Sequence, residues 1–127
     1  MYHVERAGQN KFDYINLHGG NGEILVQRYF EKLHDWNCDI DIWELAPGVT
    51  EGVHTHDEND PEYGLMDEIY VVLDGKAEMT IDGSLERLER GDAVICKARS
   101  DHSLKNIGDS LLRVLFISDS EINSKIA

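Results

Sequence analysis

Short runs in which apolar and polar residues alternate recur along most of the chain, and turn sequences separate them. The run DIDIWELA, residues 39–46, alternates and ends at Pro47-Gly48. Five later runs have the same character: DEIYVVL, KAEMTI, SLERLER, DAVICKA and LLRVLFIS. Since successive side chains of a strand point to opposite faces, this pattern predicts a series of short strands and an all-β fold.

The turns between these runs indicate antiparallel neighbours. Asp82-Gly83 is a two-residue connection of the kind typical of a type I′ hairpin. Residues 57–66, DENDPEYGLM, are acidic and contain proline and glycine, so we expect a loop there. Seven or more strands at short, regular spacing favour a sandwich or a small barrel.

The two ends of the chain have a weaker pattern. Residues 1–22 look irregular and end in the turn cluster LHGGNG, so we expect an N-terminal arm. The run EILVQRYFEKL, residues 23–33, fits helical as well as strand spacing, and its β-branched and aromatic content favours a strand. We predict one domain over residues 1–127, with a barrel core at about 23–118 and a frayed or capping tail at 119–127.

Composition and charge restrict the partners. The 127 residues include 25 acidic and 12 basic side chains, for a net charge of −13. This charge argues against binding to nucleic acid and to anionic membrane surfaces, both of which attract cationic proteins. No apolar run approaches the roughly 20 residues that cross a bilayer, and we expect no signal peptide. Cys38 and Cys96 form no CxxC motif, so we expect buried, reduced thiols in a cytoplasmic protein.

Four residues between positions 54 and 102 have the side chains of a transition-metal site. His54 and His56 are one residue apart in a segment of strand character, which directs both imidazoles to one face. Glu68 precedes the apolar run IYVVL and shares its face with Tyr70, and His102 follows later. Imidazole and carboxylate ligands together suit iron, manganese, nickel, cobalt, copper or zinc, and they do not suit calcium.

The spacing of these residues resembles the two signature motifs of the cupin family. The first motif, G-x5-H-x-H-x3,4-E-x6-G, aligns with Gly48, His54, His56, Glu68 and Gly75. The second motif, G-x5-P-x-G-x2-H-x3-N, aligns with Gly91, His102 and Asn106, so the resemblance covers about residues 40–118. The gap before Glu68 is longer than in the motif, and Lys97 and Arg99 stand where the family has proline and glycine.

This resemblance implies a double-stranded β-helix, or jelly roll, that holds one divalent transition metal ion through His54, His56, Glu68 and His102. Similar cupins are dioxygenases and decarboxylases, and others are isomerases, lyases and cyclases. We therefore expect a metal-dependent enzyme that acts on a small anionic or oxygenated molecule by oxygen-dependent or Lewis-acid chemistry. The alternative is a non-catalytic barrel that binds or senses a small molecule or a metal. A related metal-free sugar-nucleotide epimerase is disfavoured, because such enzymes use a His/Asp pair.

Tyr70 and Arg99 are the candidate catalytic residues. Tyr70 should point inward two residues from Glu68, either as a general acid or base or as a core aromatic residue. Arg99 lies just before His102 and could bind an anionic group in a bidentate manner, whereas Lys97 is more typical of a solvated position at the rim.

Other polar residues have a less specific pattern. Arg28 and Arg113 lie in predicted strands, and either could point inward. The acidic insert 57–67 is expected over the mouth of the barrel, as a solvated loop or as a lid with Gly64 as its hinge. The remaining histidines lie outside the motifs, and we expect solvated or core positions for them: His3, His18 and His34.

The apolar run that contains Glu68 also predicts an interface. If Glu68 and Tyr70 face the interior, then Ile69, Val71 and Leu73 face outward. An outward apolar stripe has to be covered by a second sheet, by the N-terminal segment or by another subunit. We therefore expect a homodimer.

Overall fold

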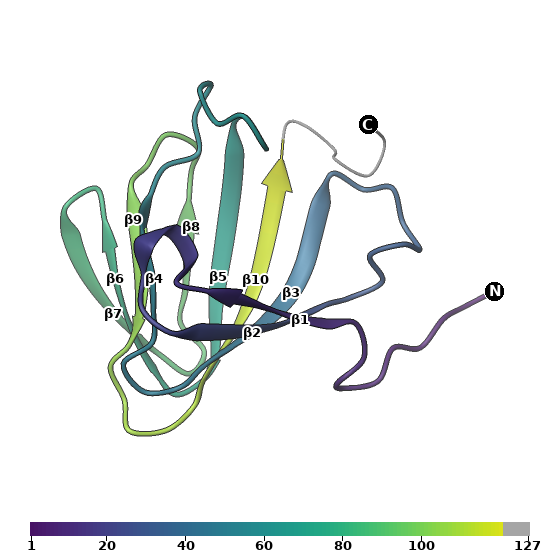
Figure 1. The fold of residues 1–127 in the computed structure, drawn as a ribbon, viewed down its shortest axis with the longest axis horizontal. Coiled ribbons are helices and arrows are strands. Elements are labelled where there is room, and N and C mark those ends of the chain that lie inside the picture. The colour runs from purple at the N-terminus through teal and green to yellow at the C-terminus, as the bar shows by residue number, and fades with distance from the viewer. Residues whose placement is uncertain (121–127) are drawn as a thin grey trace.

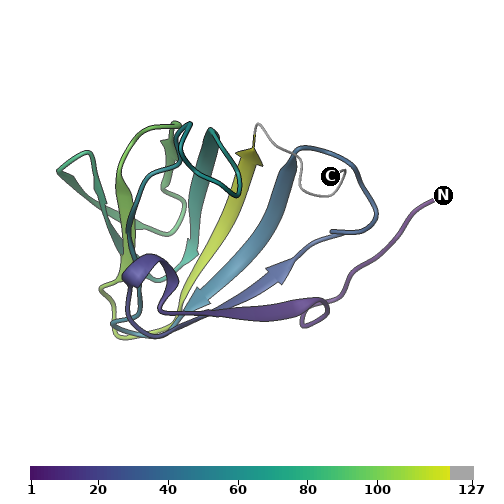
Figure 2. The ribbon, with the colours of Figure 1, turned by 45° about the horizontal axis from the view of Figure 1, so that its top comes forward.

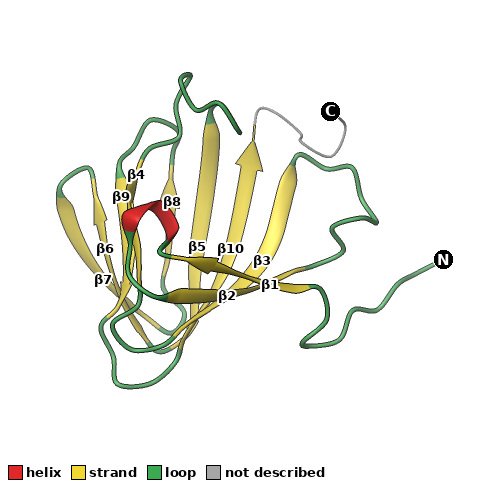
Figure 3. Ribbon diagram, viewed as in Figure 1, coloured by secondary structure: helices red, strands yellow, loops and turns green. Residues whose placement is uncertain are grey.

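The computed structural model describes residues 1–120, and the regular structure of this region is almost entirely β-strand (Figures 1 and 3). The strands are β1 (Lys11–Ile15), β2 (Glu23–Arg28), β3 (Cys38–Leu45), β4 (Thr50–His54), β5 (Met66–Asp74), β6 (Lys76–Ile81), β7 (Ser84–Glu89), β8 (Ala93–Cys96), β9 (His102–Asn106) and β10 (Leu112–Ser120). A short 3₁₀ helix, η1 (Leu17–Gly19), lies between β1 and β2. The predicted all-β fold is confirmed.

These strands form two antiparallel sheets that face each other. The large sheet has the order β1-β2-β3-β10-β5-β8, and the small sheet has the order β4-β9-β6-β7. From β3 onward the chain passes back and forth between the sheets, which is the jelly-roll topology that the motifs implied. Figure 2 shows the small sheet on the left and the large sheet on the right, and in Figure 1 β1 and β2, the end strands of the large sheet, are in front of its strands β5 and β10.

The core fills the space between the sheets with residues from alternate positions of each strand. In β5 and β10 every second side chain is buried, as the alternation in the sequence predicts. Three aromatic residues form its centre: Trp43 stacks on Phe116 with ring centroids 4.3 Å apart, and Tyr70 meets Phe116 edge-on at 5.0 Å. This packing fixes the inner face of β3, β5 and β10, and β5 also carries Glu68 on that face.

Most of the predicted turns and strands have their expected positions. Asp82 and Gly83 both have positive φ, at 50° and 81°, as a type I′ turn requires, and the turn joins β6 to β7. Residues 23–28 form a strand, which resolves the ambiguous run. The tail predicted at 119–127 lies largely outside the described residues, because β10 ends at Ser120 and the described region ends with it.

Two strands differ from the prediction. Residues 11–15, within the segment expected to be irregular, form β1 and pair with β2 along their whole length. Residues 102–106, where no strand was predicted, form β9 in the middle of the small sheet. The inward positions of β9 are His102, Leu104 and Asn106. Polar residues thus occupy two of its three core-facing positions, so the segment lacks the alternation of apolar and polar residues that predicts a strand.

The outer face of the large sheet is apolar, as the run through β5 predicted. Ile69 and Val71 are half-buried, and across the β5–β10 pair they face Ile117 and Leu115. On the other side Ile69 pairs with Ile95, which is 54% exposed. Among the described residues no helix is long and apolar enough to span a membrane.

Both cysteines are free thiols, on different strands of the large sheet. Cys96 is buried at the end of β8, and Cys38 is half-buried at the start of β3.

Asn106 connects the ends of three strands below the core. Its side-chain amide donates hydrogen bonds to the carbonyl oxygens of Leu45, at 2.9 Å, and Ser110, at 2.8 Å. Its side-chain oxygen accepts a hydrogen bond from the backbone N–H of Gly108 at 2.9 Å. Because Asn106 is only 1% exposed, water cannot replace these partners.

We predict that Asn106→Ala lowers the free energy of unfolding by about 2–4 kcal/mol, because it leaves a buried carbonyl and a turn N–H without partners. Urea unfolding followed by circular dichroism measures this change. Asn37→Ala, at an exposed position, is the matched control and should have little effect. Equal stability of the two variants would contradict the structural role of Asn106.

Candidate metal centre

Four polar side chains converge at one point between the sheets. Glu68 Oε1 lies 2.8 Å from His102 Nε2, 3.2 Å from His56 Nε2 and 3.7 Å from His54 Nε2. His54 ends β4 and is the direct cross-strand partner of His102 in β9, while Glu68 reaches the same point from β5 in the opposite sheet. The structure thus brings together the four residues that the motifs single out.

The other ring nitrogen of each histidine has an oxygen partner. His54 Nδ1 lies 2.9 Å from the carbonyl oxygen of Gly52, and His102 Nδ1 lies 3.1 Å from that of Ser100. His56 Nδ1 lies 2.7 Å from a carboxylate oxygen of Asp60. An acceptor at Nδ1 keeps the proton there, so the lone pair of each Nε2 is directed at the convergence point.

The convergence point has the properties of a cation site. His54 Nε2, His102 Nε2 and Glu68 Oε1 are buried without a hydrogen-bond partner of acceptable geometry. Each such buried polar atom costs about 1–3 kcal/mol unless it is paired. Ligand bonds of about 2.0–2.2 Å place neighbouring donor atoms roughly 3–4 Å apart, which matches the observed separations. These residues could hold a transition metal ion.

The electrostatics of the cluster favour a charged carboxylate. Burial alone would raise the pKa of Glu68, but close contact with the three imidazoles lowers it well below its ordinary value. Burial lowers the pKa of His56, and contact with Glu68 and Asp60 more than offsets this and raises the pKa to about 9. Glu68 is therefore an anion at neutral pH, and in the metal-free protein His56 is its protonated partner.

The long insert supplies one of these partners. Asp60 is fixed within the loop, because its second carboxylate oxygen accepts hydrogen bonds from the backbone N–H groups of Glu62 and Tyr63. The insert therefore orients His56 through Asp60. Whether it also opens and closes as a lid at Gly64 remains a prediction.

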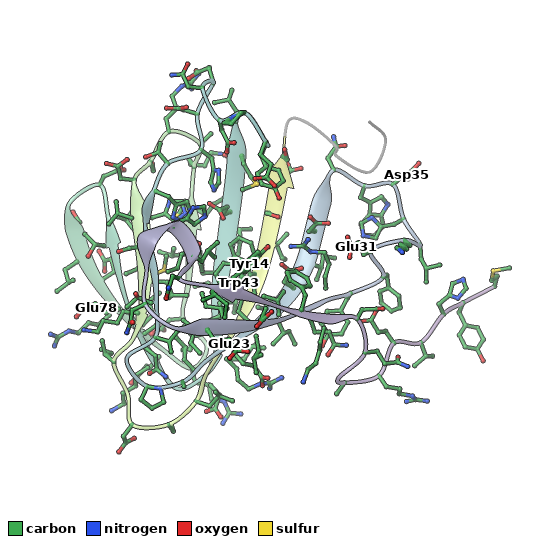
Figure 4. The ribbon with its side chains drawn as sticks, in the orientation of Figure 1. Tyr14, Glu23, Glu31, Asp35, Trp43 and Glu78 are labelled. Carbon is green, nitrogen blue, oxygen red and sulfur yellow. The ribbon has the colours of Figure 1, made fainter. Side chains whose placement is uncertain are left out.

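A cavity of about 120 Å³ lies beside the cluster. This volume is small compared with the roughly 300–1,000 Å³ of pockets that bind drug-sized ligands. Figure 4 shows Tyr14 and Trp43 close together inside the barrel, where their rings meet edge-on at 6.1 Å. The walls combine aromatic and apolar groups with polar ones: Tyr14, Leu17, Trp43, Met66 and Phe116, with His18, Arg28, Asp39, Glu51, His56, Glu62, Tyr63, Glu68 and Ser118.

Of the basic residues considered from the sequence, Arg28 lines this cavity. Its Nε and Nη2 donate to the two carboxylate oxygens of Asp41, at 2.9 and 3.0 Å, and its guanidinium lies over the ring of Phe12. Burial opposes the charge of Arg28, but Asp41 raises its pKa, so it remains a cation.

The other basic residues have ion-pair partners away from the cavity lining. Arg99 is 63% exposed and pairs with Glu58 in the insert. Lys97 pairs with Asp67, and Arg113 pairs with Glu44. The role of Arg99 as an anion anchor remains a prediction.

Tyr70 points inward, as expected, but its hydroxyl group contacts a second carboxylate. It donates a hydrogen bond of 2.7 Å to Glu51 Oε1, and both side chains are almost completely buried. Burial raises the pKa of Tyr70 and raises that of Glu51 to about 7. Glu51 lines the cavity, and its Oε2 lies 3.5 Å from His54 Nε2. General acid or base chemistry at Tyr70 remains a prediction.

Two residues of this site were not found from the sequence. Glu51 is part of β4, three positions before His54, and was not considered. His18 was expected to be solvated or in the core, and its side chain is 34% exposed, but its part in the site was not expected: its ring stacks on that of His54 with centroids 3.8 Å apart and planes 12° apart. Burial and the neighbouring imidazoles lower the pKa of His18 to about 4, so its ring is neutral at pH 7. The only feature of the sequence that could have indicated this position of His18 is the glycine pair that follows it.

Comparison with known proteins agrees with this geometry. The sequence profile described as "Cupin domain" matches residues 41–118, so the chain belongs to the cupin family. An oxalate-binding protein of Thermotoga maritima is 27% identical over 104 residues, which cover 80% of each chain. An uncharacterised protein of Methanocaldococcus jannaschii is 33% identical over 52 residues, and that match covers 41% of this chain and 42% of the relative.

A solved structure supports the fold. It is described as a predicted oxalate decarboxylase from Thermotoga maritima, and it superposes with a TM-score of 0.78 at 24% identity. The superposition covers 93% of this chain and 99% of the other. At this level of identity the likeness establishes the jelly roll, and the chemistry has to be argued from this chain's own residues.

We predict that binding of Co²⁺ releases a proton from His56. The imidazolium has a pKa of about 9 in the metal-free protein, and only its neutral form can bind an ion through Nε2. The apparent affinity should therefore rise as the pH rises from 6 and should level off near pH 9. Titration calorimetry at pH 8 in buffers with different ionisation enthalpies counts the released protons.

Asp60→Asn tests the cause of this proton release. Asparagine lacks the charge that raises the pKa of His56, and its single oxygen cannot serve both His56 and the backbone N–H groups of Glu62 and Tyr63. Less proton should be released at pH 8, and the affinity should level off at a lower pH. Asp57→Asn, in the same loop, is the control. Identical proton release in wild type and Asp60→Asn would contradict the assigned pairing.

Proposed function

We propose that this chain is a metal-dependent cupin enzyme in which His54, His56, Glu68 and His102 hold one divalent transition metal ion. The observation that supports this most directly is the convergence of three unpaired, buried atoms, His54 Nε2, His102 Nε2 and Glu68 Oε1, beside a cavity that His56 also lines. An ion bound there would supply Lewis acidity or, if it is redox-active, a site for oxygen-dependent chemistry. The three histidines and Glu68 would leave positions open for a substrate on the side of the cavity.

We infer that the substrate is a small carboxylic acid with a second oxygenated group. The cavity is too small for a large ligand, and aromatic side chains line it together with polar and charged ones. Glu68 lies on β5 and Arg28 lies on β2, with β3 and β10 between them, so the guanidinium faces the metal centre across the cavity. The carboxylates Asp39, Glu51 and Glu62 also line the cavity, so an anion should bind only when the metal is present.

Within this proposal the chain's own residues have distinct roles. Arg28, fixed by Asp41, would orient the end of the substrate remote from the metal. Glu51, fixed by Tyr70, would hold or move a proton beside His54. The stacked aromatic residues Trp43 and Phe116 would exclude water from the middle of the cavity.

A second candidate function is a barrel that binds a small acid without converting it. The Thermotoga maritima relative is described as an oxalate-binding protein, and this description favours the alternative. Both functions require the same metal centre and differ in turnover.

We predict that protein purified without added metal contains about one transition metal ion per chain, and that His54→Ala and His56→Ala lose it. Elemental analysis measures this, with His34→Ala as the control outside the cluster. The metal-loaded wild type should bind oxalate, malonate or succinate in calorimetry, and the metal-free protein should not. Formation of carbon dioxide or uptake of dioxygen with these acids supports the enzyme. Binding without turnover supports the alternative, and the absence of both metal and binding rejects the two together.

Arg28→Lys examines the far end of the cavity. Lysine keeps the charge but loses the bidentate fork, so affinity for the longer acids should fall more than affinity for oxalate, which is too short to reach from the metal to β2. Arg113→Lys, whose partner Glu44 lies outside the cavity lining, is the matched control.

We also propose that the chain forms a homodimer through the outer face of the large sheet. Ile69, Val71, Leu115 and Ile117 are neighbours on this face, and they are only half-buried. A contiguous apolar patch of this kind is typical of a surface that another protein covers.

For the dimer we predict that Ile69→Lys yields monomers, because a charge at the centre of the patch cannot be buried without a partner. Light scattering at micromolar concentration measures the mass. Leu85→Lys, on the exposed strand β7, is the control and should leave the dimer intact. A monomeric wild type would reject the proposal.

A further inference from the structure

The segment of the N-terminal arm around η1 is seated closely on β4. A β-carbon at Gly20 would collide with the carbonyl oxygen of Thr50, and one at Gly52 would collide with that of His18. Thr50 also exchanges two hydrogen bonds with Asn21: its N–H donates to the carbonyl oxygen at 2.9 Å, and its hydroxyl oxygen accepts from the N–H at 2.8 Å. Two glycines facing each other thus allow the arm to approach the strand that carries His54.

The backbone of this segment is held in an uncommon conformation. Asn16 and His18 both have positive φ, at 51° and 54°, in the left-handed region that residues other than glycine seldom adopt. The side-chain oxygen of Asn16 accepts a hydrogen bond of 2.9 Å from the N–H of Gly22 and closes the loop around η1. The contacts around this segment therefore offset the free-energy cost of the backbone conformation that positions His18.

This placement brings the His18 ring onto the metal centre from the side. It lies parallel to the ring of His54, with centroids 3.8 Å apart, and edge-on to His56 at 6.0 Å. One ring nitrogen of each of His18, His54 and His56 lies within 4.8 Å of the other two, so His18 is close to two of the candidate ligands and is stacked on the face of one of them. Its Nε2 lies 4.0 Å from Glu51 Oε2, and its ring lines the cavity.

We propose that the N-terminal arm completes the active site and that His18 is its functional residue. His18 packs on His54 and fixes the plane of that ligand, and it presents Nε2 to a molecule bound on the open side of the ion. The proposal rests on the metal centre of the proposed function, and it assigns to the arm a role that the two cupin motifs do not contain.

The test uses Co²⁺ as the metal and azide as a small anion that needs an open position on the ion. His18→Ala removes the stacked ring, and its affinity for Co²⁺ should fall about tenfold, the usual effect of losing a group that orients a ligand. The visible absorption spectrum of the bound Co²⁺ should shift as the ring of His54 gains freedom. His18→Phe keeps a stacked ring, and the chain already carries a phenylalanine in this backbone conformation at Phe30, with φ of 54°. This variant should keep its affinity for Co²⁺ but bind azide about fivefold more weakly, the effect of one lost hydrogen bond.

Gly20→Ala tests the close contact between the N-terminal arm and β4, and it changes no polar side chain. Its φ of −72° is suitable for alanine, so the expected effect comes from the collision with Thr50 alone. It should reproduce the effects of His18→Ala, whereas Gly108→Ala, where a β-carbon makes ordinary contacts, should resemble the wild type. If Co²⁺ affinity, spectrum and azide binding are unchanged in both His18→Ala and Gly20→Ala, the inference is overturned. A wild type that binds no Co²⁺ instead rejects the proposed metal centre, and a wild type whose bound Co²⁺ takes up no azide overturns the contact assigned to His18 Nε2.

Discussion

The structure depends on the approach of one carboxylate and three imidazoles to a common point. Glu68 is 2% exposed, and His54, His56 and His102 direct their Nε2 atoms at it from the other side. Buried donor atoms that face each other without partners cost several kcal/mol together, and a cation is the simplest group that satisfies them all. The arrangement is therefore stable only in a scaffold whose other interactions hold it in place. The jelly roll meets this condition, because His54 and His102 lie on paired strands of one sheet, Glu68 lies on β5 of the other, and His56 lies just beyond the end of β4.

The hydrogen-bond partners of the candidate ligands set the orientation and the basicity of their imidazole rings. Backbone carbonyls at Gly52 and Ser100 fix the protonated nitrogens of His54 and His102, and they are contributed by the same segments that carry these histidines. His56 is different, since its partner is Asp60 in the insert. Through Asp60, the insert therefore influences the protonation of His56. A carboxylate partner makes an imidazole a stronger base than a carbonyl partner does, so the three histidines are not equivalent.

The cavity lies on one side of the candidate metal centre, and it defines the side from which a molecule could reach that centre. The side chains that line it include Glu51 and His18 near the cluster, aromatic residues, and Arg28 on β2 of the large sheet. The proposed substrate, a small acid with a second oxygenated group, would meet a lining of this mixed polarity. Membership of the cupin family is consistent with such a molecule but does not specify it, because this fold supports many reactions on similar ligand sets. The identity of the substrate therefore depends on the residues that surround the motifs.

The sequence alone indicated most of the strands, their turns and the four candidate ligands, because the alternation of residues in a strand and the spacing of a motif can be read from the sequence itself. It did not indicate β1 and β9. It did not determine which of several arginines faces the interior, since Arg28 and Arg113 both lie in strands and only the sheet twist and register direct one of them inward. Arg99 falls inside the second motif but pairs with Glu58 outside the cavity lining. The position of His18 depends entirely on the tertiary structure, because its contact with His54 joins segments far apart in the chain. This contact exists because Gly20 and Gly52 let two backbones approach each other more closely than any sequence pattern predicts.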